Sequence, residues 1–222
     1  MKISYAITVC NELEEIEKLL KFLFYTKRPE DEIVILLDIV NTTKETETYL
    51  DNFSTLSIGS GIDHETNLRL YKNKFQNHFA DWKNLLKSVC KGDYIFQIDA
   101  DEIPYEYLIQ NLPEILNSNP YNDVYLVPRV NTVEGLTESH IQKWKWKVDS
   151  NGWVNFPDYQ WRIWKNLPTI KWVNKVHEKL QGYKAYAFLP GDENYALFHH
   201  KQISKQEKQN NYYDQLSTKP LH

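Results

Sequence analysis

Residues 93–104 read Asp-Tyr-Ile-Phe-Gln-Ile-Asp-Ala-Asp-Glu-Ile-Pro, and this stretch decides the fold. Residues 94–98 form a short, nearly apolar run, which is typical of a buried strand in a parallel sheet covered by helices. Three carboxylates follow directly, Asp99, Asp101 and Glu102, and Pro104 then marks a turn or a helix start. Ligands of open α/β sheets bind beyond the carboxyl ends of the strands, so the pattern places these acids at a ligand-binding edge.

Acids gathered at such an edge repel one another unless a cation binds between them. Mg²⁺ and Mn²⁺ prefer oxygen ligands and are usually shared with substrate phosphates, so Asp99 and Asp101 predict a metal-bound phosphorylated ligand. A solvated turn is the alternative, because a bare Asp-x-Asp pair also arises by chance. The strand before the pair and the Glu-x-Pro after it favour the metal site.

Strands and helices alternate through the first half of the chain. Asn11 is predicted to cap the first helix, with Glu14 as its capping-box partner. This order implies right-handed crossovers and a parallel sheet, with Asp38 and Asp99 opening on the same edge. The predicted strands are 3–10, 33–37, 94–98 and 123–130, with a weak one at 56–58, and the predicted helices are 13–23, 43–53, 79–90 and 105–116.

The second half has a different character, because aromatic residues dominate it. Trp144-Lys145-Trp146-Lys147 and residues 159–164 predict antiparallel, aromatic strands. No linker rich in Pro, Gly or Ser divides the two halves, so we expect one α/β domain over residues 1–222.

Composition restricts the classes of function. The chain has 222 residues, 41% hydrophobic, with a net charge of −4, which argues against a nucleic-acid-binding surface. No apolar run approaches a membrane span, and residues 1–4 lead into a strand rather than a signal peptide. Cys10 and Cys90 both lie in apolar segments and are expected to be buried thiols, which favours a reducing, cytoplasmic location over a disulfide between them.

An ordered set of motifs over residues 3–201 resembles the family-two glycosyltransferases, which have the nucleotide-diphospho-sugar (GT-A) fold. The set begins with Ile3-Ser4-Tyr5-Ala6-Ile7-Thr8-Val9-Cys10-Asn11-Glu12 and the strand ending in Asp38. It continues with residues 79–84, residues 92–95 and Asp99-Ala100-Asp101-Glu102. It ends with residues 160–164 and Trp172-Val173-Asn174-Lys175-Val176-His177-Glu178.

The resemblance implies a three-layer α/β/α sandwich with a mainly parallel central sheet and a small antiparallel acceptor-side region. Residues 1–101 would form the nucleotide-binding half and residues 102–222 the acceptor half. Asp38 matches the acid that contacts the base or ribose, and Asp99 and Asp101 match the pair that binds Mn²⁺ or Mg²⁺ at the diphosphate. The chain departs from the family after Asp38, where residues 39–43 replace the usual Asp and Gly-Ser turn, so the resemblance does not imply the exact base contacts.

The same resemblance implies roles for further residues. Lys83 stands where the family often has arginine and keeps the charge for phosphate without the bidentate fork. Arg162 and His177 are expected to contact the nucleotide sugar, and His199 or His200 is expected to face the metal. Each of these also has a structural interpretation, in which Arg162 packs its stem and the histidines form structural hydrogen bonds.

The implied reaction is an inverting transfer of a sugar, with UDP the expected nucleotide, to the hydroxyl of a glycan or another acceptor. The expected general base is Glu178, with Glu102 and Asp158 as reserves. Two other classes remain open. A nucleotidyltransferase would usually carry a Gly-rich basic loop, but residues 11–15 are acidic. A non-catalytic carbohydrate-binding protein would explain the aromatics, but not the acids at Asp38 and Asp99.

Overall fold

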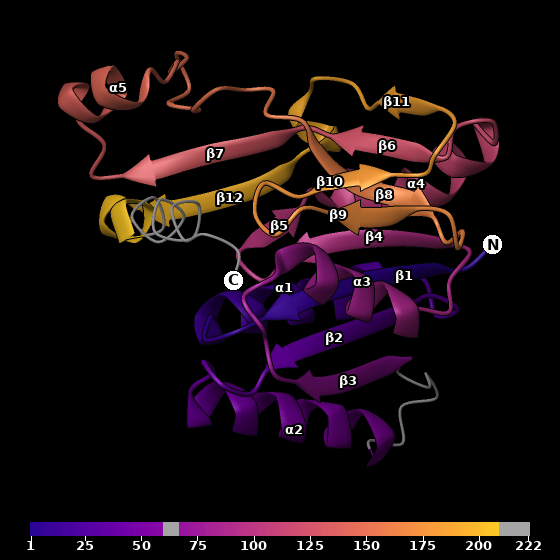
Figure 1. The fold of residues 1–222 in the computed structure, drawn as a ribbon. Helices are drawn as coiled ribbons and strands as arrows, with labels where there is room; N and C mark the ends of the chain where they lie inside the picture. The colour runs from indigo at the N-terminus through magenta and orange to yellow at the C-terminus, as the bar shows by residue number, and fades with distance from the viewer. Residues whose placement is uncertain (60–66, 209–222) are drawn as a thin grey trace.

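Seven strands form the central sheet of this computed structural model, which describes residues 1–59 and 67–208 (Figure 1). In spatial order they are β11 (Tyr186–Phe188), β6 (Val124–Val127), β8 (Gln160–Lys165), β4 (Tyr94–Asp99), β1 (Ile3–Val9), β2 (Glu32–Asp38) and β3 (Leu68–Asn73). Strand β1 pairs in parallel with both β2 and β4, and β2 pairs in parallel with β3. Strand β8 runs antiparallel to β4 and β6. The expected α/β class with a mainly parallel sheet is confirmed.

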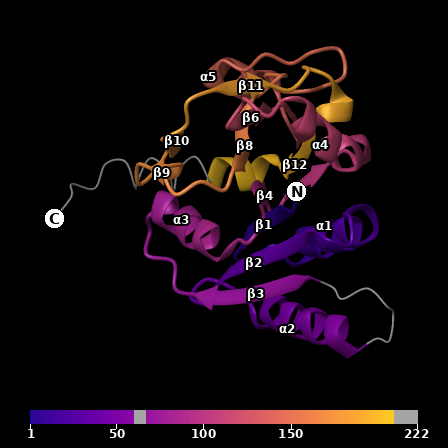
Figure 2. The same ribbon diagram turned by 90° about the vertical axis from the view of Figure 1, so that its right-hand side faces the viewer.

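The two faces of the sheet are covered differently, as Figure 2 shows. Helices α1 (Leu13–Thr26), α2 (Lys44–Gly59) and α4 (Glu106–Ser118) contribute to one buried cluster with residues such as Tyr5 and Ile7 of β1. Helix α3 (Phe79–Val89) and the hairpin of β9 (Lys171–Val173) and β10 (Lys179–Gln181) bury the opposite face, which includes Ala6. Successive side chains of a strand point to opposite faces, so one apolar strand supplies both clusters.

A small three-stranded sheet lies beside the central one. It consists of β5 (Glu102–Pro104), β12 (Leu197–Gln202) and β7 (Arg129–Glu134), in that order. Its register places Glu102 opposite His199, and His199 opposite Asn131, in one row across the sheet. The remaining elements are the short helix α5 (Glu138–Trp144) and a 3₁₀ turn, η1 (Glu193–Tyr195).

Three local predictions are wrong. Helix α1 has Glu12 rather than Asn11 at its N-cap, with no side-chain cap, because the Glu12 carboxylate accepts a bond from Cys10 N instead. Residues 56–58 continue α2 and do not form a strand. Trp144–Lys147 do not form a strand either, because α5 ends there and Lys145 turns the backbone into the left-handed region at φ 54°. Residues 159–164 do belong largely to a strand, β8.

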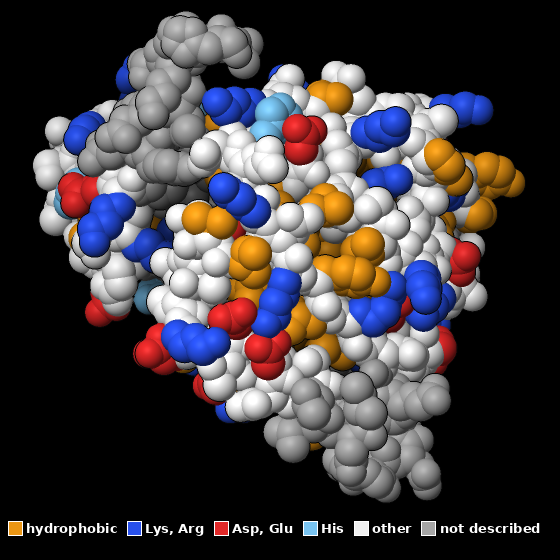
Figure 3. Space-filling view, turned by 60° about the horizontal axis from the view of Figure 1, so that its bottom comes forward, with side chains coloured by type: hydrophobic (Ala, Val, Ile, Leu, Met, Phe, Trp, Pro, Cys, Tyr) orange, Lys and Arg blue, Asp and Glu red, His pale blue; other side chains and the backbone are white. Residues whose placement is uncertain are grey.

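Both cysteines are free thiols: Cys90 is buried and Cys10 half-buried. Within residues 1–59 and 67–208, no helix is both long and apolar enough to cross a membrane. On the face seen in Figure 3, basic and acidic side chains are interspersed around a group of apolar ones, so positive charge is not concentrated there.

Candidate active site

A cavity of about 1020 Å³ opens at the carboxyl ends of β1, β2 and β4. Thr8, Cys10 and Glu12 line it from the end of β1, Asp38 from β2, and Asp99 and Asp101 from β4 and the turn after it. This is the edge at which open α/β sheets bind ligands. The cavity therefore collects the acids that follow two separate strands.

Asp38 holds the loop beyond β2. One carboxylate oxygen accepts from Val40 N at 3.0 Å and from Phe75 N at 3.2 Å, and the other accepts from Asn41 Nδ2 at 2.7 Å. The side chain is buried, although it lines the cavity. The structure thus gives Asp38 a loop-fixing role, and its contact with a base or ribose stays a prediction.

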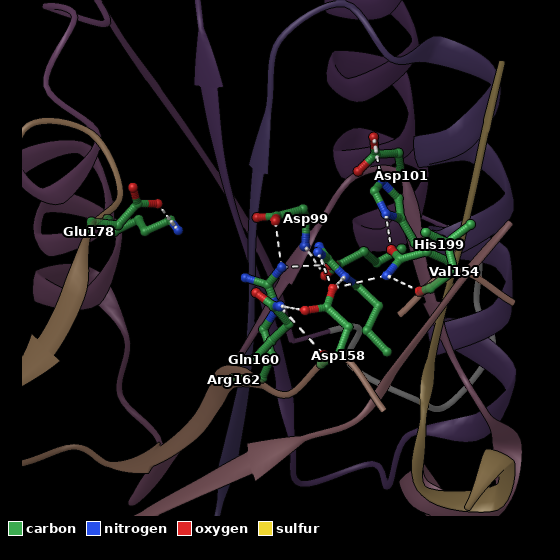
Figure 4. A network of polar contacts seen from close by, with 12 residues as sticks. Asp99, Asp101, Val154, Asp158, Gln160, Arg162, Glu178 and His199 are labelled. Atoms are coloured by element: carbon green, nitrogen blue, oxygen red, sulfur yellow. Dashed lines mark hydrogen bonds and ion pairs between the residues drawn. The ribbon is translucent and has the colours of Figure 1, made fainter. Parts of the chain in front are cut away.

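A buried arginine, Arg162, and a half-buried one, Arg129, lie among three carboxylates at one wall of the cavity and directly behind it (Figure 4). Arg162 Nη2 donates to Asp99 Oδ2 and to Glu102 Oε1, both at 2.6 Å. Arg129 donates to Glu102 Oε1 at 3.0 Å and, through Nη2 and Nε, to Asp158 Oδ2 at 2.6 and 3.0 Å. Such buried ion pairs need this many hydrogen bonds to offset the loss of solvation.

The contacts continue from Asp158 back to the acidic turn. Asp158 Oδ2 accepts from Asn131 Nδ2 at 2.9 Å, and Asn131 Oδ1 lies 2.9 Å from His199 Nδ1. His199 Nε2 faces Asp101 Oδ2 at 3.4 Å. We call this set the polar network; its members are Asp99, Arg162, Glu102, Arg129, Asp158, Asn131, His199 and Asp101. It starts and ends at the two aspartates of one short turn.

The two aspartates at the ends of the polar network, Asp99 and Asp101, are held ionised. Burial alone raises the pKa of Asp99, but the charges of Arg162 and Lys83 outweigh it and hold that pKa at about 2. Burial opposes ionisation of Asp101 as well, yet His199, Lys201 and Lys205 hold its pKa below the usual range. Asp99 and Asp101 are therefore both negative at neutral pH, which is the state a metal ligand requires.

The opposite wall carries a separate ion pair, Lys83 with Glu178, shown apart from the network in Figure 4. The Lys83 ammonium also lies over the Trp172 ring, 4.5 Å from its centroid. Asn84 fixes this wall, because its side chain donates to Trp172 O and accepts from Trp172 N, both at 2.9 Å. His177, beside Glu178, has a left-handed backbone with φ 51° and lines the cavity.

The structure brings nine of the ten candidate residues to the cavity: Asp38, Lys83, Asp99, Asp101, Asp158, Arg162, His177, Glu178 and His199. Glu102 is the exception. It is completely buried, it does not line the cavity, and its oxygens are taken by two arginines and by Asp99 N. This burial favours Glu178 and Asp158 over Glu102, whose reserve role as a general base stays a prediction.

Three residues of the site were not anticipated from the sequence. Arg129 and Asn131 alternate on β7, and Lys201 alternates with His199 on β12, so each pair shares one face of the small sheet. All four line the cavity. Polar residues at positions i and i+2 of a half-buried strand were the available signal.

The architecture and the acid-lined cavity are those of a GT-A glycosyltransferase. The model of glycosyl transferase family 2 matches residues 4–188, so the chain belongs to that family, and the expected family is confirmed. No curated protein matches the chain.

Solved structures of S. aureus TarS match the fold. The TarS 1–349 complex with UDP-GlcNAc superposes with a TM-score of 0.63 at 14% identity, over 90% of this chain and 59% of that one. The complex with UDP gives 0.62 at 14% identity, over 90% and 60%. The chain thus spans less than two thirds of the length of these structures, and at this identity the likeness concerns the fold.

Proposed function

We propose that the chain transfers a sugar from a nucleotide-diphospho-sugar to an acceptor hydroxyl, with UDP as the nucleotide. The observation that carries this proposal is the cavity itself, where Asp99 and Asp101 at the strand ends lie opposite a carboxylate, Glu178, on the other wall. The TarS crystals hold UDP-GlcNAc and UDP, which supports a uridine nucleotide here. The acceptor is a glycan or another hydroxyl compound.

Asp101 and His199 fit a divalent cation better than Asp99 does. Their oxygen and nitrogen atoms face each other inside the cavity, whereas Asp99 Oδ2 is taken by Arg162. No group of three or more possible metal-ligating side chains occurs in the described parts of the chain, so the remaining ligands would be diphosphate oxygens and water. An imidazole ligand favours Mn²⁺ over Mg²⁺. A cation held there by Asp101 and His199 would neutralise charge that develops on the departing diphosphate.

Glu178 is the proposed general base of a single inverting displacement. It lines the cavity, and of its neighbours only Lys83 is a charged partner among the contacts found in the described residues. The donor diphosphate is the anion that would draw Lys83 away and leave Glu178 to accept the hydroxyl proton. Asp158 is a weaker candidate, because Arg129, Asn131 and Gln160 occupy its oxygens and its pKa is held below the usual range against the effect of burial.

A direct test is to incubate the protein with Mn²⁺ and a panel of UDP-, GDP- and dTDP-sugars and to measure release of the nucleoside diphosphate. We expect release from a UDP-sugar, accelerated by a glycan acceptor. Calorimetry with UDP and Mn²⁺ separates the classes, because a carbohydrate-binding protein would bind neither. Turnover of a nucleoside triphosphate to a nucleotide sugar would instead show a nucleotidyltransferase.

A further inference from the structure

We infer that Asn131 is a positioning residue that aims the Nε2 atom of His199 at a metal ion beside Asp101. The inference rests on the proposed function, because it assumes the divalent cation proposed there at Asp101 and His199. Asn131 comes from β7 and is separated by 68 residues from His199, so only the fold brings the two together.

The surroundings of Asn131 fix which way its amide points. Two acceptors surround Nδ2, namely Asp158 Oδ2 at 2.9 Å and the Val154 carbonyl at 3.5 Å (Figure 4). Asp158 is also bonded to Arg129, so it is an ionised acceptor with no proton to give. The amide nitrogen must therefore face Asp158, and the amide oxygen must face His199.

The orientation of the amide in turn fixes the proton on the imidazole. Asn131 Oδ1 can only accept, so His199 Nδ1 carries the hydrogen of the 2.9 Å contact. In the neutral imidazole, which is the form that binds a metal, Nε2 then presents its lone pair toward the side of Asp101 Oδ2, 3.4 Å away. A hydrogen on Nε2 fills this contact when no metal is bound, and a cation would take its place on binding. Metal-binding histidines usually donate their other N–H to an outer partner such as Asn131.

Neither residue is free to turn. His199 is buried and is the register partner of Asn131 on the neighbouring strand. Asn131 is tied through its own backbone, because Val154 N donates to Asn131 O at 2.9 Å. The preorganised pair thus presents a ligand atom whose direction is set before any metal arrives.

The next register position offers a matched control. Thr132 pairs with His200, and the Thr132 hydroxyl lies 2.9 Å from His200 Nδ1. The contact is of the same kind, but the His200 side chain is 62% exposed and is not part of the cavity wall. A His200→Gln variant removes an imidazole of similar sequence context without touching the network.

The test is pulsed electron paramagnetic resonance of Mn²⁺ bound in the presence of UDP, which detects coupling to a coordinated imidazole ¹⁴N. The native protein and His200→Gln should both show that coupling. Asn131→Leu should lose it and bind Mn²⁺ about 10–100-fold more weakly. Asn131→Gln should keep the coupling, because its amide still has an oxygen to accept the Nδ1 hydrogen and a nitrogen to donate to Asp158; this rescue separates positioning from a general structural effect.

Three results would overturn the inference in distinguishable ways. Native protein that binds Mn²⁺ with UDP but shows no ¹⁴N coupling removes His199 as a ligand, and needs no variant. Coupling and affinity that survive in Asn131→Leu remove the positioning role while the proposed transfer stands. Native protein that binds UDP-sugar and turns it over without any bound Mn²⁺ removes the metal site and the inference together.

Discussion

The two walls of the cavity hold their carboxylates in different ways. On the wall built by α3 and the β9–β10 hairpin, Glu178 pairs with Lys83. On the wall built largely by β4, β8 and the small sheet, Asp99, Glu102 and Asp158 share Arg129 and Arg162 in a fixed set of contacts. The first arrangement is a single pair, and the second is a network.

This difference indicates which wall can take part in the reaction and which wall holds other residues in position. A carboxylate that several donors hold cannot move without breaking those contacts, so it serves to position its neighbours. A carboxylate with one flexible cationic partner can exchange that partner for solvent, substrate or product. The wall of Glu178 is therefore the one suited to accept a proton, and the wall of Glu102 is the one suited to fix Asp99.

Glu178→Gln gives the largest expected change and tests the reactive wall. It keeps the shape of the side chain but removes the base, so turnover should fall by about 10²–10⁴-fold while UDP affinity is retained. Steady-state kinetics and calorimetry measure the two quantities, with the exposed Glu114→Gln on α4 as the control. Normal turnover would show that Glu178 is not the general base, and Asp158 would then be tested in the same way.

Glu102→Gln tests the supporting wall. Removing the charge leaves the buried Arg162 and the half-buried Arg129 with one carboxylate fewer, so the free energy of unfolding should fall by about 3–5 kcal/mol. Denaturant unfolding measures the loss. A variant that unfolds like the native protein yet has lost turnover would place Glu102 in the chemistry and break the distinction between the walls.

Local patterns were enough to predict the central sheet and its acidic edge. The apolar run before Asp99, the apolar run before Asp38 and the helical spacing on α1 each depend on neighbours in sequence, so β4, β2 and α1 lie near their predicted positions. The same reasoning failed at Trp144–Lys147, because α5 is stabilised by a capping box at Thr137 and by His140 stacking on Trp144. The aromatic residues at 144–147 alone did not indicate the capping box or the stacking of His140 on Trp144.

The polar network could not be predicted, because its members meet only through strand pairing. Glu102 follows Asp101 in sequence, but the pairing of β5 with β12 turns it away from the cavity and into contact with two distant arginines. Alternation along β12 showed that one of His199 and His200 faces inward, and register with Asn131 decides that it is His199.

Lys83→Met tests the role of the cation in the Lys83–Glu178 pair. The variant keeps the aliphatic stem over Trp172 but removes the charge proposed to meet the diphosphate, so UDP binding should weaken by about 1.5–3 kcal/mol. Calorimetry measures it. Lys87→Met, one turn later on the same helix and bonded to Leu167 O, is the matched control and should bind UDP normally. Equal affinity in both variants would leave Lys83 as a structural partner of Glu178 alone.

The network also predicts how stability depends on pH. Asp99 has its pKa lowered from 3.8 to about 2 in the folded protein, so the unfolded chain takes up the proton first as the pH falls. The stabilisation from Asp99 is complete above about pH 4 and is lost as the pH drops toward 2. The free energy of unfolding of Asp99→Asn in metal-free buffer should therefore change less steeply than that of the native protein between pH 4 and 2. Parallel curves would show that Arg162 does not stabilise the ionised form.

Lys205→Ala should have the smallest effect, because it tests the edge of the network rather than its interior. Lys205 is 45% exposed, pairs with Glu15 at 3.0 Å and lies 3.9 Å from Asp101. An exposed ion pair contributes less than about 1 kcal/mol, so the free energy of unfolding should change by no more than that. Its positive charge opposes a cation at Asp101, so Mn²⁺ binding should be unchanged or slightly tighter, and the difference should vanish at high salt. Denaturant unfolding and Mn²⁺ titration at two ionic strengths measure both effects. A large loss of Mn²⁺ affinity would mean that Asp101 depends on this outer cation for its position, and that the fixed wall of the cavity extends beyond Asn131 and His199 to the chain following β12.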